Sequence, residues 1–215
     1  LPQNERVINA VTEAYERYQS NGDGAVADYI PALASASPGL FGICVVGARR
    51  RIIEIGDVET AFSIQSVSKP FVFALVCEAI GYEAARHQLG VNSTGFPFNS
   101  LIAVELNDDR TMNPLVNAGA IATTSLVPGN TADEKWEKIR DGLSRFAGRE
   151  LTLSKDVYES ESATNIRNQG IAHLLASYER LYFDPDEATD IYTRQCSLNV
   201  TAHDLAVMAA TLANG

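Results

Sequence analysis

Ser66-Val67-Ser68-Lys69 opens a strongly apolar stretch that is predicted to form a helix. If the helix includes Ser66, a separation of three residues places the serine hydroxyl and the lysine amine on one face, one turn apart. An amine in a partly desolvated pocket can take the proton of a serine, and a helix N-terminus stabilises the negative charge that develops. Because so short a motif also arises by chance, the rest of the chain must decide what it means.

The composition predicts a globular protein with reduced thiols. The chain has 215 residues, and 46% of them are hydrophobic, which is enough for a substantial core in one structural unit. A formal net charge of −10 argues against nucleic acid or an anionic membrane as the main partner. No run of 18 apolar residues is present, so no transmembrane helix is predicted. Cys44, Cys77 and Cys196 are far apart and odd in number, which predicts free thiols in a cytoplasmic protein.

Apolar periodicity predicts a hairpin among many helices. Residues 3–20 carry an apolar stripe typical of an amphipathic helix. The strand-like runs 41–46 and 51–55 are joined through Gly47 to Arg50 and predict a hairpin. The further predicted helices cover residues 69–81, 83–89, 114–126, 133–147, 154–163, 166–178, 185–195 and 201–213.

A single hairpin is marginally stable, so the predicted sheet needs more strands than residues 41–55 provide. The sequence ends at Asn214-Gly215, a signal typical of a helix C-terminus. We therefore expect residues beyond 215 to complete the sheet, either as a downstream segment or as a separate C-terminal fragment of the same protein. Because the first residue is Leu1 and not Met, we also expect that the chain was trimmed or fused upstream.

Polar residues occur within and between the predicted helices. Asn117 is predicted to lie inside a helix of small and apolar residues, where a buried amide needs hydrogen-bond partners. A ligand is one candidate partner, and a cap or bond to the backbone is the alternative. Residues 159–168 combine carboxylate, hydroxyl and amide groups, which taken alone is typical of a solvated loop.

Other kinds of site find little support. His87, His173 and His203 lack the spacing of metal ligands, and no Gly-x-Ser-x-Gly motif is present to build a Ser-His-Asp triad. Each histidine is therefore interpreted as a surface or core residue, and no metal site is predicted. The sequence also contains no phosphate-binding loop and no dinucleotide fingerprint.

Several motifs follow one another in a definite order. They are Tyr29-Ile30-Pro31-x-Leu33, Phe62-Ser63-Ile64-Gln65-Ser66-Val67-Ser68-Lys69-Pro70, Phe98-Asn99-Ser100, Asn113-Pro114-x-Val116-Asn117-Ala118-Gly119-Ala120-Ile121, the segment 161–168, and Tyr192. Together they resemble the serine-dependent glutaminase family, within the wider β-lactamase-like fold. The resemblance runs from about residue 25 to the end of the chain.

This resemblance implies an α/β architecture of the mixed α+β kind, like that of β-lactamases and transpeptidases. A mostly antiparallel sheet is covered by helices, and a helical lobe lies beside it. Residues 1–215 are then expected to be a single glutaminase domain that lacks its C-terminal strands. In this family a later tyrosine and a valine that supplies a second oxyanion N–H lie beyond residue 215.

The resemblance also implies the activity, the hydrolysis of L-glutamine to L-glutamate and ammonia. By position, Ser66 is the nucleophile that forms an acyl-enzyme, and Lys69 accepts its proton. Tyr192 matches a pocket tyrosine that holds substrate and relays a proton toward Lys69. Gln65 could support the oxyanion region, although the backbone N–H of Ser66 is the stronger candidate for the oxyanion donor.

The same resemblance implies how the amino acid end of the substrate is held. Glu161 offers a carboxylate to the α-ammonium group, whereas Asn117 and Asn168 donate to the α-carboxylate. Tyr29 matches a tyrosine at the mouth of the pocket. The family analogy further implies a homo-oligomer, with no metal and no organic cofactor.

Two other interpretations stay open. A penicillin-recognising acyltransferase or β-lactamase also uses Ser-x-x-Lys, and residues 197–199 could supply its Ser-x-Asn element. That element normally follows soon after the first, whereas here it comes about 130 residues later. The other interpretation is a catalytically silent binding or assembly module, in which Ser66 and Lys69 only form hydrogen bonds at a helix start.

Overall fold

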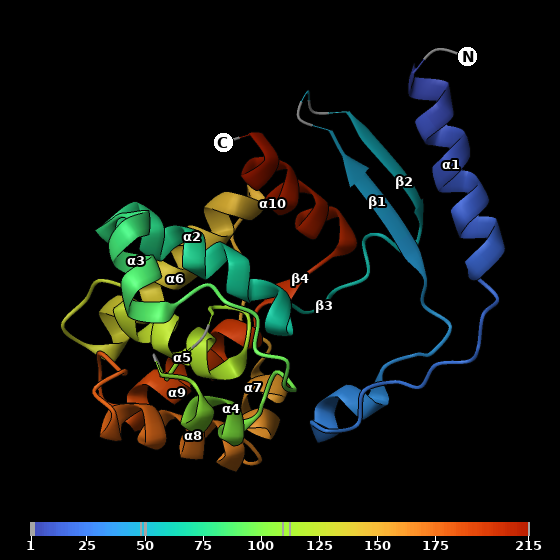
Figure 1. Cartoon of the computed structure of the whole chain (residues 1–215). Helices are drawn as coiled ribbons and strands as arrows, with labels where there is room; N and C mark the ends of the chain where they lie inside the picture. The colour runs from blue at the N-terminus through green and yellow to red at the C-terminus, as the bar shows by residue number, and fades with distance from the viewer. Residues whose placement is uncertain (1–2, 48, 50, 109, 112, 215) are drawn as a thin grey trace.

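The protein is built from helices and two small antiparallel sheets, as a computed structural model shows (Figure 1). The structure describes residues 3–47, 49, 51–108, 110–111 and 113–214. The expectations for both chain ends at Leu1 and Gly215, and for the hairpin turn at residues 48 and 50, therefore lie outside the described residues. The predicted mixed α+β class is confirmed, with helices predominating.

The predicted hairpin is present and lies between two helices. Strands β1 (Gly42–Val46) and β2 (Ile52–Gly56) pair antiparallel, with Ile43 opposite Ile55 and Cys44 opposite Glu54. Helices α1 (Gln3–Tyr18) and α10 (Ala202–Asn214) pack on the hairpin from its two sides (Figure 1). Because side chains alternate along a strand, one face of the hairpin meets α1 and the other meets α10.

A second strand pair was not predicted. Strand β3 (Phe62–Ser63) pairs antiparallel with β4 (Asn199–Val200). Each strand has only two residues, too few for an alternating pattern to be recognised. The pair is nevertheless important, because β3 leads directly into the segment that carries Ser66 and β4 leads directly into α10.

The rest of the described chain forms a helical lobe. At its centre α5 is buried along nearly its whole length, in contact with α2, α8 and α9. None of the described helices is long and apolar enough to cross a membrane. The elements of this part of the chain are the 3-10 helices η1 (Pro31–Ser35) and η2 (Gln65–Ser68) and the α-helices α2 (Lys69–Ile80), α3 (Tyr82–Leu89), α4 (Leu101–Leu106), α5 (Asn117–Leu126), α6 (Ala132–Ala147), α7 (Lys155–Ser162), α8 (Ile166–Ser177) and α9 (Pro185–Cys196).

All the predicted helices exist, but one of their starts was wrong in a way that matters for the site. The helix predicted over residues 114–126 begins at Asn117, because the Asn113 side chain accepts hydrogen bonds from the backbone N–H groups of Leu115 and Val116 and holds a turn there. Asn117 is therefore the first residue of α5 and not an interior residue. The predicted start of α2 at Lys69 is confirmed, and Ser66 lies in the preceding 3-10 turn and not in the α-helix itself. The short helix α4 was not predicted at all.

Gly119 allows the turn at Asn113 to pack directly on α5. A Cβ atom at Gly119 would lie 1.8 Å from the backbone oxygen of Asn113, so one of the two segments would have to move. We expect Gly119→Ala to lower the free energy of unfolding by about 1–3 kcal/mol, the usual cost of overpacking. Gly170 in α8 is the matched control, because a Cβ there meets nothing within 4 Å.

Gly170→Ala should leave stability unchanged or raise it by about 0.5–1 kcal/mol, since alanine favours the helix. Urea unfolding followed by circular dichroism measures both variants. Equal effects at the two positions would show that the close approach at Gly119 is not a constraint on the fold.

Candidate active site

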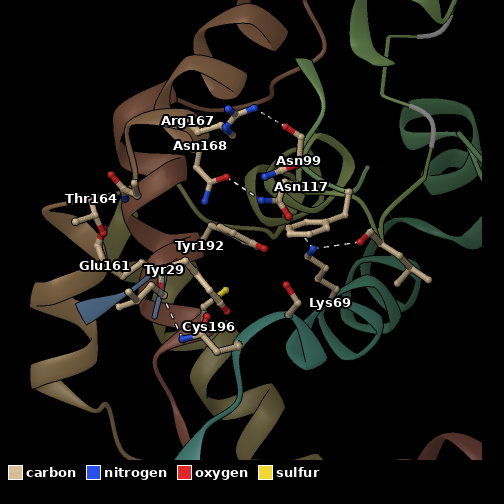
Figure 2. A pocket seen from close by; sticks show the side chains of 16 residues that line it. Tyr29, Lys69, Asn99, Asn117, Glu161, Thr164, Arg167, Asn168, Tyr192 and Cys196 are labelled. Atoms are coloured by element: carbon tan, nitrogen blue, oxygen red, sulfur yellow. Dashed lines mark hydrogen bonds between the residues drawn. The ribbon is translucent and has the colours of Figure 1, made fainter. Parts of the chain in front are cut away.

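All eight predicted site residues line one pocket. The cavity has a volume of about 740 Å³ and draws its walls from segments far apart in the sequence (Figure 2). Lys69 and Asn117 are the first residues of α2 and α5, and Asn168 lies in the first turn of α8. The positive ends of three helix dipoles therefore meet at this pocket, an arrangement suited to a carboxylate or a developing oxyanion. The predicted residues found in its lining are Tyr29, Gln65, Ser66, Lys69, Asn117, Glu161, Asn168 and Tyr192.

Ser66 sits on a strained turn at the entrance to α2. The preceding residue, Gln65, has φ = +49°, a left-handed conformation that costs energy for a residue with a side chain. The Ser66 side chain is exposed to the pocket, whereas Ser68 in the same turn is fully buried. The turn thus presents one serine to a ligand and uses the other to anchor itself.

A buried chain of hydrogen bonds holds this turn in place. Ser68 Oγ donates to the backbone oxygen of Gln65 at 2.8 Å and accepts from Gln195 Nε2 at 2.9 Å. Gln195 Oε1 in turn accepts from Thr124 Oγ1 at 3.0 Å. The bonds run from α5 through α9 to the strained residue, so the position of Ser66 depends on the packing of the helical lobe.

The Lys69 amine is buried and oriented by two uncharged acceptors. Its Nζ donates to Asn117 Oδ1 at 2.8 Å and to the backbone oxygen of Leu115 at 3.1 Å (Figure 2). Burial lowers the pKa of Lys69, which favours the neutral amine. A neutral amine has two N–H donors and one lone pair. The two acceptors use both donors, and the lone pair remains to accept a proton.

Tyr192 projects from α9 into the base of the pocket, with its hydroxyl directed toward the Lys69 amine (Figure 2). Burial, with a smaller contribution from Cys196, raises the pKa of Tyr192 well above its ordinary value, while a hydrogen bond with Ser66 opposes the rise. The phenol is therefore protonated at neutral pH and can donate. Cys196 lies one turn further along the same face of α9, where burial raises the pKa of its thiol to about 12.

A pair of hydrogen-bonded asparagine side chains extends from Lys69 toward α8. Asn117 Nδ2 donates to Asn168 Oδ1 at 2.9 Å, so the Asn117 amide joins the lysine to Asn168 (Figure 2). With the oxygen of each asparagine already engaged, the orientation of both amides is defined. Asn168 keeps its NH₂ group as a donor, and this group carries no net charge.

Glu161 is the buried carboxyl group of the pocket. It is 7% exposed, and burial raises its pKa to about 7, although a hydrogen bond from Gln65 Nε2 at 3.4 Å acts in the opposite direction. Tyr29 lines the same wall but is 68% exposed, as expected for a residue at the mouth. A carboxylate with so little solvation gains strongly from a cationic partner.

The lining also includes residues that had no predicted role. Arg167 Nη1 donates to the backbone oxygen of Asn99 at 3.5 Å, a contact that joins α8 to the segment before α4 across the rim (Figure 2). The Phe98 ring lies 5.7 Å from Lys69 Nζ, measured to its centroid. Both Asn99 and Arg167 lie within motifs recognised in the sequence, so their position in a motif was the available signal. The cysteine in the lining, Cys196, was predicted only as a free core thiol, and all three cysteines of the chain are free.

Comparison with known proteins agrees with this geometry. The profile of the family described as Glutaminase matches residues 24–215. The chain belongs to the glutaminase family. "Glutaminase 2" of Yersinia pestis is 59% identical over 215 residues, which is all of this chain and 63% of that protein. The "Glutaminase" of Brucella abortus (strain S19) is 52% identical over 211 residues, which is 96% of this chain and 67% of that protein. The glutaminase-family chain thus spans about two thirds of the length of these relatives.

Solved structures of glutaminases have the same fold. The structure of the probable glutaminase ybaS superposes with a TM-score of 0.96 at 41% identity, covering 100% of this chain and 69% of that one. The structure of Mglu in its glutamate form superposes with a TM-score of 0.87 at 34% identity, covering 96% of this chain and 48% of that one. A probable glutaminase from Bacillus subtilis complexed with 6-diazo-5-oxo-L-norleucine superposes with a TM-score of 0.79 at 29% identity, covering 95% of this chain and 61% of that one. The expected β-lactamase-like fold is confirmed.

The hydrogen bonds of Gln195 predict that its amide stabilises the turn that carries Ser66. Gln195→Met keeps the volume but leaves Ser68 and Thr124 without their buried partner. We expect the free energy of unfolding to fall by about 1–3 kcal/mol, the cost of unsatisfied buried groups. Gln19→Met, at an exposed position after α1, should stay within about 0.5 kcal/mol of wild type in the same urea titration. A loss at Gln195 no larger than that at Gln19 would contradict the anchoring role.

Proposed function

We propose that this chain provides the catalytic and amino-acid-binding groups of a glutaminase that hydrolyses L-glutamine through a Ser66 acyl-enzyme. The observation that carries the proposal is the arrangement of one pocket. Ser66, Lys69 and Tyr192 line the same cavity as the carboxyl group of Glu161 and the amide of Asn168. Membership of the glutaminase family supports it, as does the similarity to Mglu, which has been solved in a glutamate form.

In the proposed first half-reaction, Ser66 Oγ attacks the carbonyl carbon of the substrate carboxamide. The hydroxyl proton passes to the neutral amine of Lys69, whose free lone pair is available because its two N–H groups are already bonded. The C–N bond breaks as the leaving nitrogen takes up a proton from Lys69, relayed by the Tyr192 hydroxyl. Ammonia departs, and an ester between Ser66 and the glutamyl group remains.

In the second half-reaction, water attacks the ester and gives its proton to Lys69. The Ser66–acyl bond breaks, Ser66 regains a proton, and glutamate is released. The backbone N–H of Ser66, at the N-terminal end of α2, is the proposed oxyanion donor in both steps. Gln65 supports the geometry of this donor through its left-handed conformation.

Recognition of the substrate as an amino acid is assigned to the other polar groups that line the pocket. The Glu161 carboxylate binds the α-ammonium group, and the amides of Asn117 and Asn168 donate to the α-carboxylate. Because Asn117 also accepts from Lys69, binding of the carboxylate and orientation of the base involve one side chain. Tyr29 covers the mouth of the pocket.

We further propose the assembly and setting of the protein. Residues 1–215 fold as one domain. Additional strands extend its sheet, and they come either from a downstream segment or from a separate C-terminal fragment of the same protein. The relatives are longer than this chain, which leaves room for such strands. By analogy with the family, the protein is a homo-oligomer.

Three free cysteines support a reducing, cytoplasmic setting. The β-lactam-recognising enzyme and the silent assembly module are not favoured by the family match.

The nucleophile is tested by ammonia release from L-glutamine. The assay compares this chain alone with the chain extended by the C-terminal residues of the Yersinia pestis relative. Ser66→Ala should lower kcat about 10⁴-fold or more in every form that turns over, because no other group replaces the hydroxyl. Ser37→Ala, at an exposed position outside the pocket, is the matched control and should keep wild-type activity.

Turnover that survives Ser66→Ala would exclude the acyl-enzyme. No turnover in either form would favour a silent module, and acylation of Ser66 by a β-lactam would favour the penicillin-recognising class.

The raised pKa of Glu161 predicts an acidic limb in kcat/KM. The free enzyme binds the α-ammonium group only when Glu161 is ionised, so kcat/KM should fall as the pH drops below about 7. Glu161→Gln should remove this limb and lower kcat/KM at neutral pH about 10–100-fold, the loss of one charge-assisted hydrogen bond. Glu159→Gln, on the exposed side of the same helix, is the matched control. It should change neither the acidic limb nor the value of kcat/KM at neutral pH.

A second substrate distinguishes a loss of α-ammonium binding from a loss of folding in the Glu161 variant. Glutaramic acid lacks the α-ammonium group and should be a far poorer substrate than L-glutamine for wild type. In Glu161→Gln this preference for L-glutamine should shrink. A preference that is unchanged in the variant would show that another group binds the ammonium.

A further inference from the structure

A cluster of three metal-ligating side chains lies away from the active site. Cys44 comes from β1, Glu54 from the residue paired with it on β2, and His203 from the first turn of α10. The three ligand atoms all lie within 4.8 Å of one another. Only tertiary contact unites them, since Cys44 and His203 come from distant parts of the chain, so the spacing along the sequence could not indicate this group.

One of the distances within the cluster matches the ligand separation of a tetrahedral zinc site, and a second is shorter. Zinc binds thiolate at about 2.3 Å and imidazole or carboxylate at about 2.0–2.2 Å, so two of its ligand atoms are about 3.3–3.6 Å apart. Cys44 Sγ lies 3.6 Å from Glu54 Oε1. His203 Nδ1 lies 2.5 Å from the same oxygen, at hydrogen-bond distance. Replacing that bridging proton with a metal ion requires the contact to open by about 1 Å, given these ligand separations.

The local charge favours a cation. Hydrogen bonding to Glu54 is the main cause that raises the pKa of His203, and Glu59 adds to it. Burial is the main cause that raises the pKa of the Cys44 thiol to about 11. The hydrogen bond and charge of Glu54 and the charge of Glu59 act in the same direction. The Glu54 carboxylate lies beside both other groups, so a divalent ion bound there meets a negative charge and has to displace the thiol proton.

The ligands are carried by elements that hold them in register. Cys44 and Glu54 are a directly paired couple of the hairpin, and the backbone N–H of His203 donates to the Val58 oxygen just beyond β2. Side-chain exposure of about a third at Glu54 and His203 leaves an open side for a water molecule as fourth ligand.

We propose that Cys44, Glu54 and His203 bind a divalent transition-metal ion of the zinc type and so join the hairpin to α10. On binding, the Cys44 thiol and the bridging position between Glu54 and His203 release their protons to solvent, and sulfur, oxygen and nitrogen coordinate the ion. Because α10 follows β4 and β4 pairs with β3, the ion would stabilise the scaffold that leads to the nucleophile turn.

The chain offers matched controls for each ligand. His173 also pairs with a carboxylate, Asp186, at 3.0 Å, but belongs to no three-ligand group among the described residues. Cys77 is a partly exposed thiol on α2 outside the cluster. The test variants are Cys44→Ser and His203→Gln, and the controls are Cys77→Ser and His173→Gln.

The experiment is equilibrium titration of the reduced, metal-free chain with Zn²⁺, followed by mass measurement under native conditions. Wild type and both controls should bind one ion per chain, whereas the two test variants should bind at least about 10–100-fold more weakly, the loss produced even by changes outside the first coordination shell. Co²⁺ should give a thiolate-to-metal absorption band in wild type that Cys44→Ser abolishes. Zn²⁺ should also raise the Tm of wild type but not of the test variants.

A measurement on the unmodified chain guards against variants that fail to fold. Zn²⁺ should slow alkylation of Cys44 several-fold, while alkylation of Cys77 in the same molecules stays unchanged. Weak, non-stoichiometric binding by wild type, binding that is equal in all variants, or equal protection of the two thiols would each overturn the proposal. In those cases Glu54 and His203 form only an ion pair with a thiol beside it.

Discussion

The buried amine of Lys69 is the group on which the geometry of the pocket depends. A lysine that is 4% exposed must have its hydrogen bonds satisfied within the protein, and the Asn117 side chain and the Leu115 backbone satisfy them. Both acceptors lie at the start of α5, so the position of that helix also determines the direction of the amine. Because both acceptors are uncharged, they orient the amine without stabilising its protonated form as a carboxylate would.

The remainder of the fold supports this arrangement from two directions. From the helical lobe, Thr124 and Gln195 reach the Ser68 hydroxyl and through it the strained Gln65. From the other side, the two-residue pair β3–β4 holds the segment that enters the turn. A left-handed residue with a side chain, such as Gln65, is maintained only when its surroundings are rigid, and here two independent sets of contacts provide that rigidity.

Much of the site could be predicted because its residues lie in local motifs. Tyr29, Gln65, Ser66, Lys69, Asn117, Glu161, Asn168 and Tyr192 were all recognised from sequence, and all line the pocket. Long amphipathic segments and the hairpin were likewise recognised, since their periodicity is a local property. The pair β3–β4 was missed because two residues carry no period. The start of α5 was misplaced because the hydrogen bonds of the Asn113 side chain in the preceding turn, not helix propensity, determine it.

The sequence by itself determined the long helices, the hairpin, the family resemblance and the identity of the polar residues in the pocket, because these are encoded in contiguous runs. The tertiary structure alone decided which of those residues touch one another. The bond between Lys69 and Asn117 and the meeting of Cys44 with His203 join parts of the chain that are far apart in sequence. Spacing along a sequence carries information only within one element, whereas contacts between elements depend on how their buried faces pack.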